Sequence, residues 1–175
     1  MGDFPPQGSG ISNVIQLIQT ITVSVDTTSI TFSNLDINTD KKYMIDALIN
    51  CKQNNTSYSL FVNNNTTAAN YYRTELNADF GAVATTSGND AGFIFISQAG
   101  DRLYADIKII LGDDGLTRSQ TQIQRDLFGI GNQGVWLASI AYSVAIANIT
   151  RLDIVGNNAD SIGAGSFFRL YRIKP

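Results

Sequence analysis

Short runs of alternating apolar and polar residues, separated by turn residues, recur along this chain and limit what it can fold into. In the last of them, Phe168 and Leu170 alternate with Arg169 after a Gly-Ala-Gly-Ser turn at residues 163–166. A period of two is the pattern of a β-strand with one buried face. Because a frayed strand would leave its N–H and C=O groups without partners, we expect this last strand to be paired inside a sheet.

The same pattern predicts about nine strands spaced by turns, with little or no helix. Residues 11–21 have apolar residues at a spacing that fits a helix as well as a strand, so both stay open there. We expect a loop at 85–92, and the polar stretch 116–134 has no assignment. The predicted β segments are 21–25, 30–37, 43–51, 57–62, 71–74, 92–97, 102–111, 135–144, 149–155 and 166–173, with 92–97 and 102–111 paired as a hairpin.

Strands at this spacing are typical of a sandwich or a barrel. A chain of 175 residues is most naturally one domain. We therefore predict an N-terminal arm, residues 1–10, followed by one all-β antiparallel β-sandwich domain, residues 11–175. Since the last strand is expected to be tied into the sheet, we assign any attachment role to the arm.

Charged residues make up only 15% of the chain, against about 25% in typical soluble domains. Asn, Thr, Ser and Gln supply the polar surface instead. Such a surface fits a protein covered by its neighbours, and it equally fits a weakly charged extracellular-type β-domain. The net charge is −3 and no basic run occurs, which argues against nucleic acid as a partner. No apolar segment approaches the roughly 18–20 residues of a membrane span.

The residues that hydrolytic enzymes need are scarce in this sequence. There is no histidine, so Ser–His and Cys–His catalysis and histidine metal sites are excluded. We expect no enzymatic activity and no cofactor. Asp90, Asp101, Asp113 and Asp114 could gather around calcium, but their spacing matches no calcium loop. Cys51 ends a predicted strand, and a small buried apolar side chain is favoured there over a reactive thiol.

The N-terminal arm contains the first candidate binding residues, Asp3, Phe4, Pro5 and Pro6. Phe4 is an apolar side chain beside two prolines that stiffen the segment. Such an arm can reach a neighbouring subunit or shell and bury its aromatic ring there, or it can be a disordered terminus.

Aromatic residues supply the other candidates. Tyr71, Tyr72 and Arg73 lie beside Asn-rich loops, where aromatic and amide groups could bind a glycan by stacking and hydrogen bonds. Packing between strands is the alternative, and the favoured one. Trp136, the only tryptophan, alternates with Val135 and Leu137, so a role in the core or at a subunit interface is favoured over a sugar platform.

Several segments resemble a family of small tailed-bacteriophage virion structural proteins. They are the strand pair at 21–25 and 29–35, the strand at 42–49, and the ending at 163–173. The long middle of the chain has Asn-Thr and Tyr-rich pieces similar to that group but no sharp motif. The resemblance implies a jelly-roll-like sandwich, assembly into trimers, and a place on the outside of a virion as a capsid decoration (cement) or fibre protein.

The leading hypothesis is a non-enzymatic virion structural protein. It would form a homotrimer that the arm anchors to the major capsid protein, or to another virion protein, on the outer surface of the capsid. The alternative is a receptor-binding module of a tail or head fibre that recognises host surface glycan. A third class, an enzyme acting on polysaccharide, would need a cleft with paired carboxylates.

Overall fold

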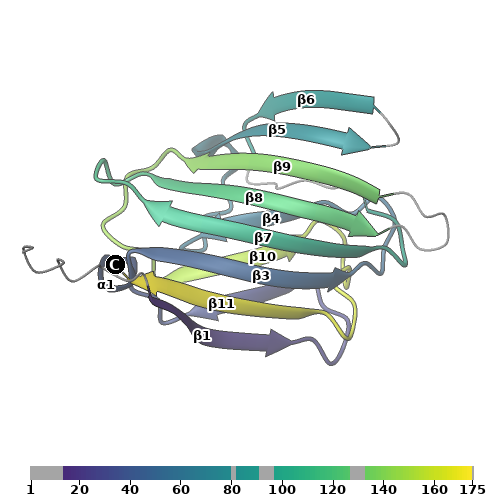
Figure 1. Ribbon diagram of the computed structural model, residues 1–175, viewed down its shortest axis with the longest axis horizontal. Helices are drawn as coiled ribbons and strands as arrows, with labels where there is room; N and C mark the ends of the chain where they lie inside the picture. The colour runs from purple at the N-terminus through teal and green to yellow at the C-terminus, as the bar shows by residue number, and fades with distance from the viewer. Residues whose placement is uncertain (1–13, 80–81, 91–96, 127–132, 175) are drawn as a thin grey trace, which may run out of the picture.

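The computed structural model describes residues 14–79, 82–90, 97–126 and 133–174. Within them, eleven strands form two antiparallel sheets packed face to face (Figure 1). The α-helix α1 (Ile37–Asp40) and the 3-10 helix η1 (Ala68–Asn70) are single turns. The strands are β1 (Val14–Thr22), β2 (Ser29–Ser33), β3 (Lys42–Asn50), β4 (Tyr58–Val62), β5 (Tyr71–Asp79), β6 (Ala82–Gly88), β7 (Arg102–Leu111), β8 (Thr117–Asp126), β9 (Gln133–Tyr142), β10 (Arg151–Gly156) and β11 (Phe167–Lys174).

The larger sheet has eight strands in the order β1-β11-β3-β7-β8-β9-β5-β6, and the smaller has three in the order β2-β10-β4. Figure 1 shows the large sheet in front, with the small sheet behind it. The chain alternates between the sheets from β1 to β4 and again from β9 to β11, and β7, β8 and β9 form a meander between these parts. This wrapping confirms the predicted jelly-roll-like antiparallel sandwich, with more strands than expected.

The core lies between the two sheets and follows from the alternation in the sequence. The burial pattern of β7 changes at every residue from Arg102 to Ile110, so one face of the strand is apolar and buried. A fully buried large apolar side chain contributes about 1.5–3 kcal/mol. The small sheet supplies Phe32, Leu60, Leu152 and Ile154 to this core, and the large sheet supplies Tyr43, Ile45, Ile49, Ile107, Phe168 and Leu170.

The C-terminal strand is paired on both sides, as expected from its pattern. β11 lies between β1 and β3 in the large sheet. Phe168 and Leu170 are fully buried, while Arg169 between them is exposed and pairs with Asp46 of β3 at 3.5 Å. The pairing of β1 with β11 joins segments from opposite ends of the chain.

The segment around β1 differs from the prediction in two respects. Residues 14–22 form a strand, which resolves the choice between helix and strand for the described part of 11–21, and residues 11–13 lie outside the described residues. The predicted strand 21–25 is wrong, because β1 ends at Thr22 and Val25 is 76% exposed in the turn before β2. The predicted exit strand at 35–37 is also corrected, because Ile37 begins the single turn of α1.

Two strands were not expected. The predicted loop at 85–92 is wrong, since residues 82–88 form β6 at the edge of the large sheet. The unassigned stretch 116–134 contains β8, which pairs along its whole length with β7 and β9. Residues 92–96 of the predicted strand 92–97 lie outside the described residues. Its predicted partner β7 pairs with β3 and β8 on its two edges.

Candidate functional site

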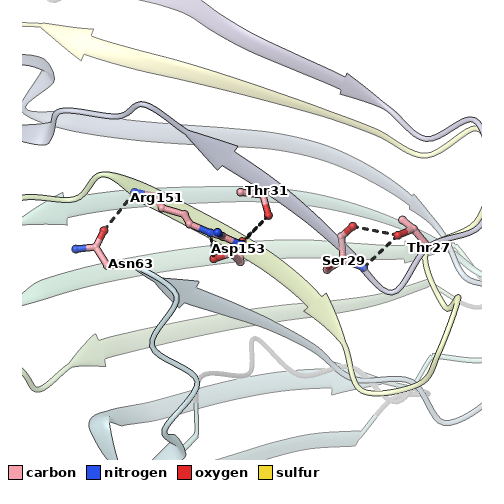
Figure 2. Close-up of polar contacts among 6 residues, drawn as sticks. All are labelled: Thr27, Ser29, Thr31, Asn63, Arg151 and Asp153. Carbon is pink, nitrogen blue, oxygen red and sulfur yellow. Dashed lines mark hydrogen bonds and ion pairs between the residues drawn. The ribbon is translucent and has the colours of Figure 1, made fainter.

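On the outer face of the small sheet, polar side chains form hydrogen bonds and ion pairs with one another (Figure 2). Asp153 of β10 is only 4% exposed, and its carboxylate accepts hydrogen bonds from the Arg151 guanidinium and the Thr31 hydroxyl. The Asn63 side-chain oxygen accepts from the backbone N–H groups of Thr150 and Arg151. These contacts occupy the Asp153 carboxylate and the Asn63 side-chain oxygen and tie the strands of the small sheet to one another.

The outer face of the large sheet differs, because it contains a groove of about 930 Å³. The groove crosses six strands, from β3 through β7, β8, β9 and β5 to β6. Neighbouring strands of a wide sheet are rotated relative to one another, so its far strands turn relative to the near ones. We call this feature the sheet groove.

Two cross-strand rows of side chains form the sheet groove. In each row, residues from neighbouring strands lie opposite one another in the antiparallel register, on the face that alternation leaves exposed. The first row is Lys108, Gln120, Ser139, Thr74 and Ser87, with Met44 of β3 opposite Lys108. The second row is Asp106, Gln122, Leu137, Leu76 and Thr85.

The polar side chains of these rows are not used by the fold. Among the described residues, no hydrogen bond or ion pair engages the side chains of Gln120, Gln122, Thr74, Asp106 or Lys108. The Asp153 carboxylate on the small sheet, by contrast, accepts hydrogen bonds from Arg151 and Thr31. The groove therefore presents free amide, hydroxyl and charged groups around an apolar centre made by Leu76 and Leu137.

Two exposed tyrosines flank the sheet groove. Tyr72 precedes Thr74 by two residues on β5, and Tyr104 precedes Asp106 by two residues on β7, so each lies on the groove's face of the sheet. Their exposed fractions are 50% and 44%. Tyr72 and Tyr104 thus offer flat apolar surfaces beside the polar rows.

Glu75 lies between Thr74 and Leu76 on β5, so its side chain points to the opposite, buried face of the sheet, where its carboxylate is engaged. It lies 3.4 Å from the Arg73 guanidinium and accepts a hydrogen bond from the Asn77 amide. Glu75 and Arg73 are both buried. Asp106 is the one carboxylate among the described lining residues that is free of protein contacts, and glycoside hydrolysis uses a pair.

A second exposed feature lies at the other end of the large sheet. Ile15 and Leu17 of β1 are 58% and 48% exposed on the face that they share with Tyr171 and Ile173 of β11, and Val14 is 56% exposed on the same strand. We call these five residues the apolar corner. Within the described residues, β1 pairs on one side only, with β11. The apolar corner therefore borders a free strand edge.

Tyr71 and Tyr72, two of the predicted glycan or interface residues, point to opposite faces of the large sheet. Tyr71 is buried, with its ring centre 4.9 Å from that of Tyr142 and 5.9 Å from that of Phe61. Its hydroxyl donates to the Asn65 carbonyl and accepts from the Val62 N–H. Burial raises the pKa of Tyr71 to about 12. Tyr71 thus packs between strands, the favoured alternative, while Tyr72 faces solvent beside the groove.

Arg73 and Trp136 also lie on the buried face. The Arg73 guanidinium contacts both Glu75 and Asp90, each at 3.4 Å. Trp136 is 6% exposed, with the Arg125 guanidinium 6.0 Å from its ring centre. The structure therefore does not bring Tyr71, Arg73 and Trp136 together with Tyr72 on one surface. Asp3, Phe4, Pro5 and Pro6 lie outside the described residues, so their anchoring role stays a prediction.

The four aspartates considered for calcium do not gather. Asp90, Asp101 and Asp114 pair with three different arginines, Arg73, Arg125 and Arg118. In the described part of the chain, no group of three or more Asp, Glu, His or Cys residues could hold a metal ion.

The single cysteine, Cys51, is 2% exposed, and burial raises the pKa of its thiol. The expectation of a buried apolar side chain at this position is confirmed.

The sequence prediction missed the residues of the sheet groove. Gln120, Gln122 and Gln124 alternate on β8, and this repeat of one polar residue type was the available signal. This glutamine repeat was not recognised as one face of a strand because the other face of β8 is also mostly polar. Among the helices that the structure describes, none has the length and apolar character needed to cross a membrane. No family model, curated protein or solved structure matches the chain.

Proposed function

We propose that this chain is a non-enzymatic structural protein that assembles with copies of itself on the outer surface of a virion. In this proposal the unit is a homotrimer that decorates a bacteriophage capsid, and the arm at residues 1–10 anchors it to a capsid protein. The bacteriophage context is supported by the resemblance of residues 21–25, 29–35, 42–49 and 163–173 to that family.

The observation that supports self-assembly is the free edge of β1. This strand, Val14–Thr22, is nine residues long and contains no charged residue and no proline. Free strand edges usually carry charges, prolines or bulges that prevent pairing with other chains. β1 has one irregularity, between Leu17 and Gln19, and it lies on the side that pairs with β11.

The apolar corner lies beside this edge, so a partner that covers β1 also buries Ile15 and Leu17. In a closed ring of identical subunits every copy is covered in the same way. The low charge of the surface agrees with contacts of this kind, because charged residues are depleted in the cores of protein interfaces. Burial against neighbouring subunits is thus the proposed mechanism.

Immunogold labelling of intact particles, with an antibody raised against this chain, tests the proposed location. We expect gold over the whole head, and we expect removal of residues 2–10 to release the protein from the capsid. Label confined to the tail tip would overturn the decoration role and favour a receptor-binding fibre. Particles without label would overturn the virion assignment itself.

A further inference from the structure

We propose that the sheet groove binds a neutral oligosaccharide. This activity goes beyond the proposed structural role and does not depend on it, because the groove lies over β3 and β5–β9 and self-assembly is assigned to β1.

The groove is long and open, which fits a chain rather than a compact molecule. It crosses six strands, and since neighbouring strands lie about 4.8 Å apart, it extends over roughly 24 Å. The two rows lie two residues apart along each strand, a spacing of about 7 Å. These dimensions suit a short oligosaccharide lying across the strands.

The lining matches the surface of a sugar. Gln120, Gln122, Thr74, Ser139 and Thr85 offer both donors and acceptors, and a neutral sugar presents hydroxyl groups that both donate and accept. Leu76 and Leu137 provide an apolar strip for the C–H groups of the sugar rings. Tyr72 and Tyr104 add aromatic surfaces on the two sides, where a ring can stack while the hydroxyl stays in water.

Other classes of ligand fit this lining less well. The rows contain one free carboxylate, Asp106, and one ammonium group, Lys108, so the groove has no excess positive charge for phosphate or a polyanion. A peptide that adds to a sheet needs free backbone N–H and C=O groups. The groove strands β7, β8, β9 and β5 are each paired on both sides, so a peptide cannot add to their ladders, and among the described groove strands only β6, at the end of the groove, has an unpaired edge.

A glycan array probed with the purified full chain is the first test, followed by calorimetric titration with the best neutral oligosaccharide. Truncating one hydrogen-bonding side chain removes about 1.4 kcal/mol, which corresponds to a tenfold change in affinity. We therefore expect Gln122→Ala to weaken binding about tenfold. The matched control is Gln53→Ala, an exposed glutamine in the turn after β3, which should leave the affinity unchanged.

Two further measurements locate the site and separate it from self-assembly. Addition of the oligosaccharide should shift the backbone amide NMR signals of β8, β9 and β5 but not those of β2 and β10. Ser139→Arg should fill the groove and abolish binding while the amide spectrum stays folded. Leu17→Asp, a change in the apolar corner, should leave binding intact, so that a failure of the assembly proposal does not count against the groove.

Absence of neutral glycan binding on the array would overturn the inference. Amide shifts confined to the small sheet or to the apolar corner would overturn the location. Selective binding of polyanions or peptides, in place of neutral sugars, would show that the groove has a different ligand class.

Discussion

Two small residues shape the turn before β11. Gly165 has φ +84°, a backbone conformation that residues with a side chain rarely adopt. The hydroxyl of Ser166 donates to the Gly163 carbonyl at 2.6 Å and accepts from the Asn50 N–H at 2.9 Å. This turn therefore attaches the start of β11 to the end of β3, and the Gly-Ala-Gly-Ser motif has a clear structural role.

Gly165→Ala should destabilise the protein, because a Cβ at positive φ costs about 1–2 kcal/mol. The new Cβ would also lie 3.1 Å from the Asn50 side-chain nitrogen. We expect the midpoint of thermal unfolding, followed by circular dichroism, to fall by several degrees. The neighbouring change Ala164→Ser, at an exposed position, is the control and should have almost no effect. An unchanged midpoint for Gly165→Ala would contradict this account of the turn.

At the scale of elements, the strands that sequence patterns predicted are those with one apolar face. The strands at 43–51 and 102–111 were placed within a residue at each end, because their buried positions hold Ile, Leu, Tyr and Ala. β8 was missed because four of the five residues on its buried side are polar, Thr117, Ser119, Thr121 and Arg125, and Ile123 is the one apolar residue there. A strand with a single apolar residue on its buried face has no period of two to detect.

The same limit applies to β6 and to the candidate site. β6 is built from small residues, Ala, Thr, Ser and Gly, which resemble a loop in composition. The sheet groove depends on the register of six strands, since Gln120, Ser139 and Thr74 become neighbours only after β8, β9 and β5 pair. Such long-range pairing is a property of the fold, and the pattern of a single strand does not contain it.

The buried polar face of β8 leads to a stability prediction. The Thr121 hydroxyl is buried and has no hydrogen-bond partner among the described residues. Thr121→Val should therefore keep or raise the free energy of unfolding, by up to about 1 kcal/mol, because an unsatisfied polar atom is removed. Chemical denaturation monitored by fluorescence measures this difference.

Thr56→Val is the matched control for Thr121→Val. Thr56 is also buried, but its hydroxyl donates to the Gln53 carbonyl and accepts from the Asn158 amide. Its replacement should lower the free energy of unfolding by about 1–3 kcal/mol, since both partners lose a hydrogen bond. Equal losses for the two variants would mean that the Thr121 hydroxyl also contributes to stability.

At the scale of the whole molecule, the two ends of the large sheet differ in chemistry. The apolar corner lies on β1 and β11, at one edge of the sheet, while the polar sheet groove extends from β3 to β6, the strand at the opposite edge. The two features adjoin where Tyr171 of β11 pairs with Met44 of β3. The proposed assembly therefore covers the β1 edge and leaves the part of the groove from β7 to β6 facing solvent.

Leu17→Asp should dissociate the assembled protein. A charge placed in the apolar corner would be buried without a partner, so we expect the dissociation constant to rise by a hundredfold or more, about 3 kcal/mol. Light scattering after gel filtration should then give the monomer mass of 19.0 kDa in place of the trimer.

Val25→Asp serves as the control for Leu17→Asp. Val25 is the most exposed large apolar residue among those described, and it lies in a turn outside the β1 ladder. This variant should remain trimeric. Dissociation by both substitutions, or a wild-type chain that is a monomer at every concentration tested, would contradict the assembly proposal.

The pairing of β1 with β11 places Val14 opposite Lys174. The described chain is therefore close to a closed loop, in which the first and last strands are neighbours. A short linker from 174 to 14 could join them without crossing the molecule, and a new start could be made at the turn between β7 and β8, where residues 112–116 separate the two strands. Every strand pair would survive such a circular permutation, so the order of strands along the gene is only one of several that would build this sandwich.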